Sequence, residues 1–223
     1  MLGGTRFKME LFLLVINLMG TAAFAVSGAV VALRKGMDIF GVCTLGLTTA
    51  VGGGVIRDVI LGNTPPVTFR DPTYAIVALA VSVLIFLLGK RRLLHENERF
   101  FNLLLLWMDS LGLGVFTVTG VDVAYRSVEE PSLFLLAFVG VVTGVGGGVL
   151  RDVMAQDTPF ILVKHVYASA SLAGAFVCVG LYRFCGTLPA TLVGIAVVVL
   201  IRVLSAHYRW NLPRVALQEE TKV

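Results

Sequence analysis

Two heptapeptides of this chain are nearly identical, GGGVIRD at residues 52–58 and GGGVLRD at residues 146–152. Both copies lie near the end of a long apolar run, where each glycine costs a helix about 0.8–1.0 kcal/mol relative to alanine. Both also place an arginine and an aspartate in a segment that otherwise carries no charge. A motif that destabilises a membrane helix, repeated 94 residues further along, indicates two equivalent positions in a duplicated fold.

The apolar runs around the two copies are typical of a membrane protein. Of the 223 residues, 57% are hydrophobic and 14% are charged, with a mean hydropathy of +0.89, whereas soluble domains carry about 25% charged residues. Because about 20 apolar residues cross a bilayer as a helix, we predict an all-α membrane protein with seven transmembrane helices. The spans are expected at residues 10–33, 39–61, 73–89, 102–124, 132–154, 165–184 and 188–206.

The distribution of charged and metal-binding residues disfavours several functional classes. The net charge of +4 comes from Lys and Arg clusters between apolar runs, and not from a basic stripe interleaved with aromatics. The three cysteines and three histidines show no metal-ligand spacing, and no serine–histidine arrangement suggests a nucleophile. We therefore expect no nucleic-acid partner, no metal, no cofactor and no enzymatic activity.

The duplication extends well beyond the two heptapeptides. A first repeat of three helices is expected over residues 10–89 and a second over 102–184. A seventh helix at 188–206 and a short tail complete a single transmembrane domain of residues 1–223. Three is an odd number, so the second repeat enters the membrane from the opposite side, as in transport proteins with inverted repeats. The matching residues are Gly20, Phe24 and Gly28 with Gly112, Phe116 and Gly120 at an offset of 92, and Thr64-Pro65 with Thr158-Pro159 at 94.

Two interpretations of the glycine triplets follow from their chemistry. Three consecutive glycines can unwind or kink a membrane helix, and the freed carbonyls could then coordinate a cation along a wet cavity. Alternatively, small residues let two helices cross closely, as they commonly do in bilayers. The second interpretation suffices for one triplet, whereas two triplets at matching positions of an inverted repeat also favour the first.

Charged and polar side chains lie inside the same spans. The Arg57 backbone is about 5 Å beyond Gly54 on a helix, and a charge at mid-membrane costs at least about 2.5–3.5 kcal/mol. These charges must therefore face a polar interior or extend outward to the headgroups. Asp109 is expected to be a cation ligand or an arginine's partner. Neighbouring residues point in different directions on a helix, so we expect each arginine to find its partners on other helices. The candidate pathway residues are Gly52, Gly53, Gly54, Arg57, Asp58, Gly146, Gly147, Gly148, Arg151, Asp152, Asp109, Ser27 and Thr119.

The Lys and Arg residues also predict the orientation. Seven spans put the two termini on opposite sides, with six of these residues on the N-terminal side and twelve on the other. Because cytoplasmic loops carry the excess of Lys and Arg, we expect the N-terminus outside and the C-terminus in the cytoplasm.

The doubled GGGVIRD and GGGVLRD motif, in a chain of three, three and one helices, resembles the prokaryotic trimeric intracellular cation channels. FAVSGAVVALRKGMDIFG at 24–41 and LPR at 212–214 fit the same family. The resemblance covers essentially the whole chain. It implies a homotrimer in a prokaryotic inner membrane, in contact with membrane lipids. It also implies one pore in each subunit, lined by the second and fifth helices, kinked at their glycines, and permeable to potassium or sodium ions.

One departure and one alternative accompany this resemblance. Animal members carry Lys-Glu-Val where this chain has Arg151-Asp152-Val153, so lipid or calcium regulation is not carried over. A few bacterial relatives have been linked to glycine uptake. A secondary transporter for a small amino acid such as glycine, built on the same inverted repeat, is therefore the alternative to a channel.

Overall fold

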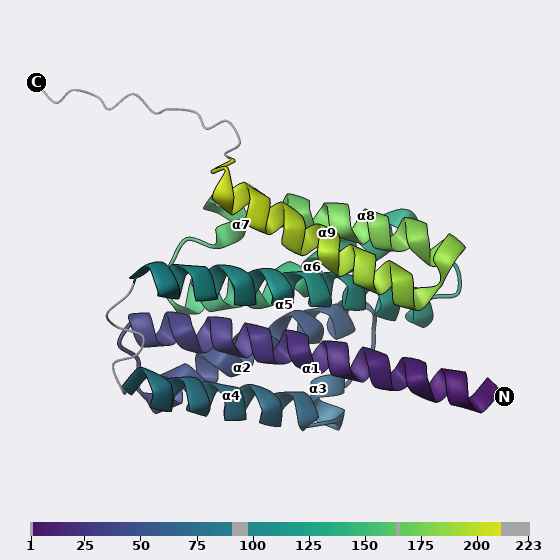
Figure 1. Cartoon of the computed structure of the whole chain (residues 1–223). Coiled ribbons are helices and arrows are strands. Elements are labelled where there is room, and N and C mark those ends of the chain that lie inside the picture. Colours follow the sequence, from purple (N-terminus) through teal and green to yellow (C-terminus); the bar gives the residue numbers. More distant parts are fainter. Residues whose placement is uncertain (1, 91–97, 164–165, 211–223) are drawn as a thin grey trace, which may run out of the picture.

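The computed structural model describes residues 2–90, 98–163 and 166–210, and these residues form helices joined by short loops (Figure 1). The LPR segment at 212–214 and the tail lie outside the described residues, as does most of the basic cluster at 90–92. The helices are α1 (Leu2–Arg34), α2 (Ile39–Ile60), α3 (Val67–Arg70), α4 (Thr73–Lys90), α5 (Glu98–Ser127), α6 (Leu133–Met154), α7 (Phe160–Val163), α8 (Ala168–Cys185) and α9 (Thr187–His207).

The seven long helices confirm the seven expected spans. Six of them are long and apolar enough to cross a membrane, and α4 contributes the shorter apolar stretch Thr73–Gly89. α1 and α5 are longer than their predicted spans of 10–33 and 102–124. The apolar run marks only the part of a helix inside the hydrocarbon, whereas helical hydrogen bonding continues through the charged residues at its ends.

The inverted repeat is visible in the two short helices that the sequence analysis did not predict. α3 follows α2 and α7 follows α6, and the two lie near opposite ends of the bundle (Figure 1). The Asp58 carboxylate accepts a hydrogen bond from Val67 N at 2.9 Å, and the Asp152 carboxylate accepts one from Phe160 N at 2.8 Å. The same aspartate therefore anchors the same short helix in both repeats.

The turns after α2 and α6 also match. Asn63 N donates to Asp58 O at 2.8 Å, and Asp157 N donates to Asp152 O at 2.9 Å. This six-residue closure needs a left-handed residue just past the helix. Glycine fills that position in the first repeat, at Gly62 with φ +73°, whereas the second repeat has Gln156 at φ +56°.

The glycine triplets allow α2 and α6 to cross in direct backbone contact. A Cβ atom on Gly53 would lie 2.2 Å from Thr143 O, and a Cβ on Gly147 would lie 2.1 Å from Thr49 O. Both helices remain α-helical through their triplets. Neither triplet is therefore unwound, and the close-crossing interpretation accounts for these glycines. Two helices packed this tightly leave no space into which the backbone could unwind.

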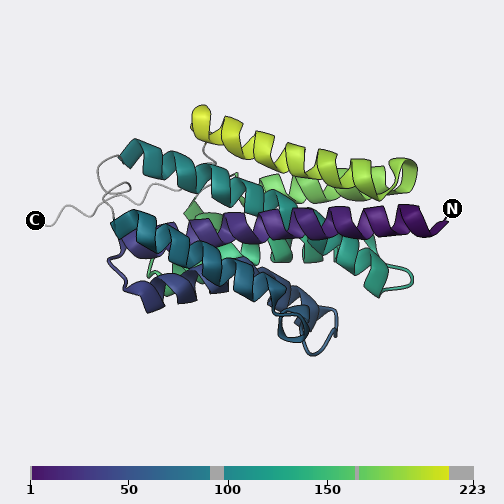
Figure 2. The same cartoon turned by 60° about the horizontal axis from the view of Figure 1, so that its bottom comes forward.

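The seventh helix breaks the symmetry of the repeat. α9 packs against α8 and α5, and both views show α8 and α9 together on one side of the bundle (Figures 1 and 2). Three of the six repeat helices, α1, α2 and α4, form the opposite side. α9 therefore adds side chains to the second repeat that have no equivalent in the first.

Candidate functional site

Arg151 on α6 has no exposed surface. Its guanidinium donates from Nη1 to Asp109 Oδ1 at 2.7 Å and from Nε to Asp152 Oδ1 at 2.8 Å. Nη1 also donates to the Ser27 hydroxyl, which comes from α1 in the other repeat. One side chain therefore ties α1, α5 and α6 together inside the bundle.

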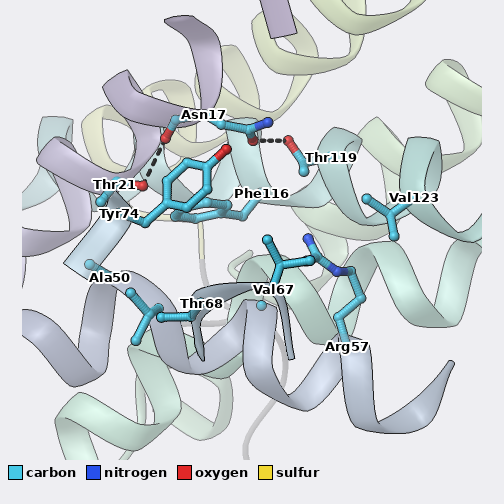
Figure 3. Close-up of a pocket in the computed structure, with 12 residues that line it drawn as sticks. Asn17, Thr21, Ala50, Arg57, Val67, Thr68, Tyr74, Phe116, Thr119 and Val123 are labelled. Carbon is cyan, nitrogen blue, oxygen red and sulfur yellow. Dashed lines mark hydrogen bonds between the residues drawn. The ribbon is translucent and has the colours of Figure 1, made fainter. Parts of the chain in front are cut away.

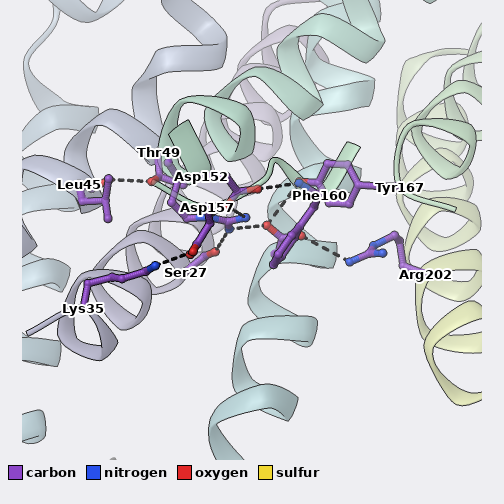
Figure 4. Close-up of polar contacts among 11 residues, drawn as sticks. Ser27, Lys35, Leu45, Thr49, Asp152, Asp157, Phe160, Tyr167 and Arg202 are labelled. Carbon is purple, nitrogen blue, oxygen red and sulfur yellow. Dashed lines mark hydrogen bonds and ion pairs between the residues drawn. The ribbon is translucent and has the colours of Figure 1, made fainter. Parts of the chain in front are cut away.

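Two more residues complete this site, which we call the Arg151 cluster (Arg151, Asp109, Asp152, Tyr167, Arg202 and Ser27). The Tyr167 hydroxyl donates to Asp109 Oδ1 at 3.3 Å, and Arg202 Nη2 on α9 lies 3.5 Å from Asp109 Oδ2. Figure 4 shows Arg202 reaching the cluster from the side opposite Ser27. With two arginines and two aspartates, the cluster is formally neutral, as buried charges inside a membrane protein must be.

The arginines of the two repeats also bond their sequence neighbours. Arg57 Nε donates to Asp58 Oδ1 at 2.8 Å, just as Arg151 does to Asp152. The expectation that adjacent residues would need partners only on other helices is wrong in this respect. Helical spacing sets the directions of the Cβ atoms, whereas a guanidinium on a three-carbon chain is long enough to fold back toward its neighbour. The other expected partner, Asp109 on a different helix, is present for Arg151.

Arg57, the equivalent of Arg151 in the first repeat, lines a cavity of about 160 Å³ instead of a cluster of charges (Figure 3). The cavity lies between α1, α2, α3, α4 and α5. Figure 3 shows Arg57 on one side of it and Asn17 and Thr119 on the other, hydrogen-bonded to each other at 2.7 Å. Its lining residues are Asn17, Thr21, Ala50, Val51, Gly54, Arg57, Val67, Thr68, Tyr74, Phe116, Thr119 and Val123.

A second cavity of about 210 Å³ lies beyond the Arg151 cluster, toward the opposite end of the bundle. Asp152 and Phe160 form part of its wall, together with the basic end of α1 at Arg34 and Lys35. Lys35 pairs with Asp157 at 2.5 Å at the rim. Each of the two cavities is lined by side chains of both repeats, and Arg57 lines one while Asp152 of the Arg151 cluster lines the other.

The structure brings most of the predicted site residues to this seam between the repeats. Gly54 lines the first cavity, and Gly148 lies so close to Tyr167 that an added Cβ would be 2.7 Å from its hydroxyl. Gly52 and Gly146 belong to the crossing: a Cβ on Gly52 would meet Leu150, and one on Gly146 would meet Gly53. Ser27 and Thr119 are equivalent in the repeat but have different partners: Ser27 accepts a hydrogen bond from Arg151, and Thr119 donates one to Asn17.

Comparison with known proteins agrees with this architecture. A family model described as a glycine transporter matches residues 14–90 and again 106–183, one match for each repeat. The UPF0126 inner membrane protein YadS of Escherichia coli K12 is 38% identical over 206 residues, which is 92% of this chain and 96% of the relative. YvgT of Bacillus subtilis, a UPF0126 membrane protein, is 36% identical over 199 residues, or 89% and 94% of the two chains.

Solved structures match the whole bundle. A prokaryotic TRIC channel crystallised in 0.5 M KCl has a TM-score of 0.83 at 30% identity, over 91% of this chain and 100% of that one. The TRIC trimeric intracellular cation channel orthologue from Rhodobacter sphaeroides has a TM-score of 0.81 at 34% identity, over 89% and 99%. The chain belongs to the TRIC cation channel family. This TRIC protein is an integral membrane protein of the inner membrane, and its fold is that of a channel rather than an enzyme.

Sequence analysis of this TRIC protein missed Arg202, Tyr167 and Tyr74 as site residues. Arg202 lies four residues inside the predicted seventh span, and a buried charge in a span is itself a signal of a functional site. The two tyrosines match at an offset of 93, because the loop after Thr158-Pro159 is one residue shorter than that after Thr64-Pro65. The offsets of 92 and 94 alone did not reveal that pair.

Proposed function

We propose that this TRIC protein conducts monovalent cations, chiefly potassium, through a pathway within each subunit of a homotrimer. The pathway runs along the seam between the repeats, from the Arg57 cavity to the cavity beside Asp152, and passes α2 and α6. The observation that carries the proposal is the Arg151 cluster, a neutral set of buried charges at the seam between the repeats. Neutralised arginines repel a passing cation far less than free ones would.

The orientation forms part of the same proposal. The N-terminus and the Arg57 cavity face outward, and the C-terminus and the Asp152 cavity face the cytoplasm. Single cysteines placed at residue 63 and at residue 156, in a cysteine-free background, test this with an impermeant reagent. Labelling of both positions from one side of the membrane would refute the prediction that these two loops lie on opposite membrane faces.

Purified protein in liposomes tests conduction. A channel gives electrogenic potassium flux that rises linearly with voltage and does not saturate at millimolar concentrations. Replacing potassium by a large cation should remove the current. Current that is absent in correctly assembled trimers, or carried equally by chloride, would overturn the proposal.

Glycine transport is the second candidate, and the match of both repeats to a glycine transporter family model favours it. The same liposomes distinguish the two functions, because carrier uptake saturates and has a low turnover, whereas channel flux is fast. Saturable uptake of radiolabelled glycine without potassium current would replace the first proposal by the second.

A further inference from the structure

The inverted repeat makes the Arg57 cavity and the Arg151 cluster two versions of one site. The equivalent residues are Arg57 and Arg151, Asn17 and Asp109, Thr119 and Ser27, Tyr74 and Tyr167, and Gly54 and Gly148. All five residues of the first set line the Arg57 cavity. In the second set, Arg151, Asp109, Ser27 and Tyr167 are hydrogen-bonded to one another, and Gly148 lies against Tyr167. A difference between the two sites therefore shows what each one lacks.

The first site lacks a carboxylate. In the second site, the Asp109 carboxylate accepts from Arg151 Nη1 and from the Tyr167 hydroxyl. In the first site its equivalent is the neutral Asn17, whose amide oxygen accepts from Thr119. Arg57 contacts the described side chain of Asp58 through Nε and Nη2, and the residue itself lines the cavity. An arginine guanidinium is a strong donor for a carboxylate oxygen.

The first site also lacks the balancing cation. In the Arg151 cluster, the charge of Asp109 is offset by Arg202 from α9, and the first repeat has no equivalent of α9. Arg57, the one charged residue of the described cavity wall, is already offset by Asp58. A bare carboxylate entering the cavity would therefore add an unbalanced negative charge inside the membrane, which is unfavourable. A ligand that brings its own positive charge would not.

We propose that the Arg57 cavity binds a small zwitterionic amino acid. Its carboxylate occupies the place that Asp109 takes in the second repeat, on Arg57 Nη1 and the Tyr74 hydroxyl. Its ammonium group supplies the charge that Arg202 supplies there, and faces the oxygens of Asn17 and Thr68. The cavity, of about 160 Å³, has room for a molecule the size of glycine or alanine.

This site goes beyond cation conduction, and binding to it does not require that the amino acid be transported. Equilibrium binding and flux are measured separately, so the failure of one leaves the other standing. A channel that conducts potassium without binding glycine would refute the site and not the channel. A protein that binds glycine without conducting potassium would refute the channel and leave the binding site standing.

Isothermal titration of the purified, detergent-solubilised protein with glycine, acetate and methylammonium tests the proposal. We expect glycine to bind, acetate to bind at least tenfold more weakly, and methylammonium to give no saturable heat. No saturable binding of glycine would overturn the proposal, as would methylammonium binding as tightly as glycine. Acetate binding as tightly as glycine would overturn the assignment of a zwitterion.

Three variants locate the binding. Asn17→Asp places a carboxylate of the protein itself in the site and should weaken glycine binding at least 100-fold, and Arg57→Gln removes the donor and should have a similar effect. Asn63→Asp is the matched control, because it adds the same charge in the loop after α2, outside the described cavity wall, and should change binding less than about twofold. If Asn17→Asp fails to fold, Arg57→Gln decides. Wild-type affinity in a folded variant of either residue would overturn the proposed site.

Discussion

Replacing Asp109 by asparagine removes one charge from the Arg151 cluster and keeps the shape of the side chain. The carboxylate is fully buried and contacts both arginines, at 2.7 Å from Arg151 and 3.5 Å from Arg202. In the variant, Asp152 is the one carboxylate left to face these two buried guanidinium groups. Breaking a buried ion pair by removing one partner costs about 3–5 kcal/mol, because it leaves an uncompensated charge. We expect a loss of stability of that size for Asp109→Asn.

A second substitution should restore much of this loss. Arg202→Met removes the extra positive charge, and the double variant then has one arginine paired with its neighbouring aspartate. That is the arrangement that the first repeat already has at Arg57, Asp58 and Asn17. The double variant should therefore be more stable than Asp109→Asn alone, with a coupling free energy of about 2–3 kcal/mol between the two positions.

Thermal unfolding of the detergent-solubilised protein, followed by intrinsic fluorescence and by size exclusion, measures this cycle. A chain of this size shifts its Tm by about 2–4 °C per kcal/mol, so Asp109→Asn should lower the midpoint by about 6–20 °C. Arg202→Met alone should cost less, because Asp109 keeps its bond to Arg151. Additive effects of the two substitutions, or an unchanged midpoint in Asp109→Asn, would refute the view that these charges act as one unit.

Three further predictions follow from the packing and the turns. Gly53→Ala should destabilise the fold by at least about 1–3 kcal/mol, because its Cβ would lie 2.2 Å from a backbone oxygen of α6. Gly180→Ala, inside α8, meets nothing within 4 Å and should keep or slightly raise the thermal midpoint, because alanine favours a helix over glycine. Gln156→Gly should raise Tm by about 2–4 °C, since glycine relieves about 1 kcal/mol of left-handed strain; an unchanged or lower midpoint contradicts this. Asp58→Asn leaves the charge of Arg57 uncompensated and should reduce potassium conductance about tenfold in planar bilayers. A potassium ion about 10 Å from that charge is repelled by about 1.7 kcal/mol at an effective dielectric constant of 20, which raises the barrier to permeation. Wild-type conductance would refute a pathway past this arginine.

The sequence predicted the frame of the molecule well because its signals are periodic and repeated. Seven apolar runs set the long helices, and the offsets of 92 and 94 set the inverted repeat. The partnership of Asp109 with Arg151 was also within reach, since an acid and an arginine inside a membrane each need an opposite charge. The short helices α3 and α7 were not, because four residues are too few to show a helical period.

The details of the site depended on information that one sequence does not contain. A glycine triplet fits both an unwound helix and a close crossing, and only the neighbouring backbone at Thr49 and Thr143 decides between them. The pairing of Arg57 with Asp58 depends on how a long side chain folds back, and Cβ directions do not describe that. Arg202 belongs to α9, which has no counterpart in the first repeat, so the symmetry of the repeats could not predict its contact with Asp109.

The seventh helix has a consequence for the direction of the molecule in its membrane. Two identical inverted halves would have no preferred face, since turning the molecule over exchanges them, and states open on either side would be equally populated. α9 packs against α5 and α8 and places Arg202 in the second half, 3.5 Å from Asp109. A difference of only about 1.4 kcal/mol between the two states sets a tenfold preference at equilibrium. The appended helix thereby adds to the inequality of the two halves that Asn17 and Asp109 already create.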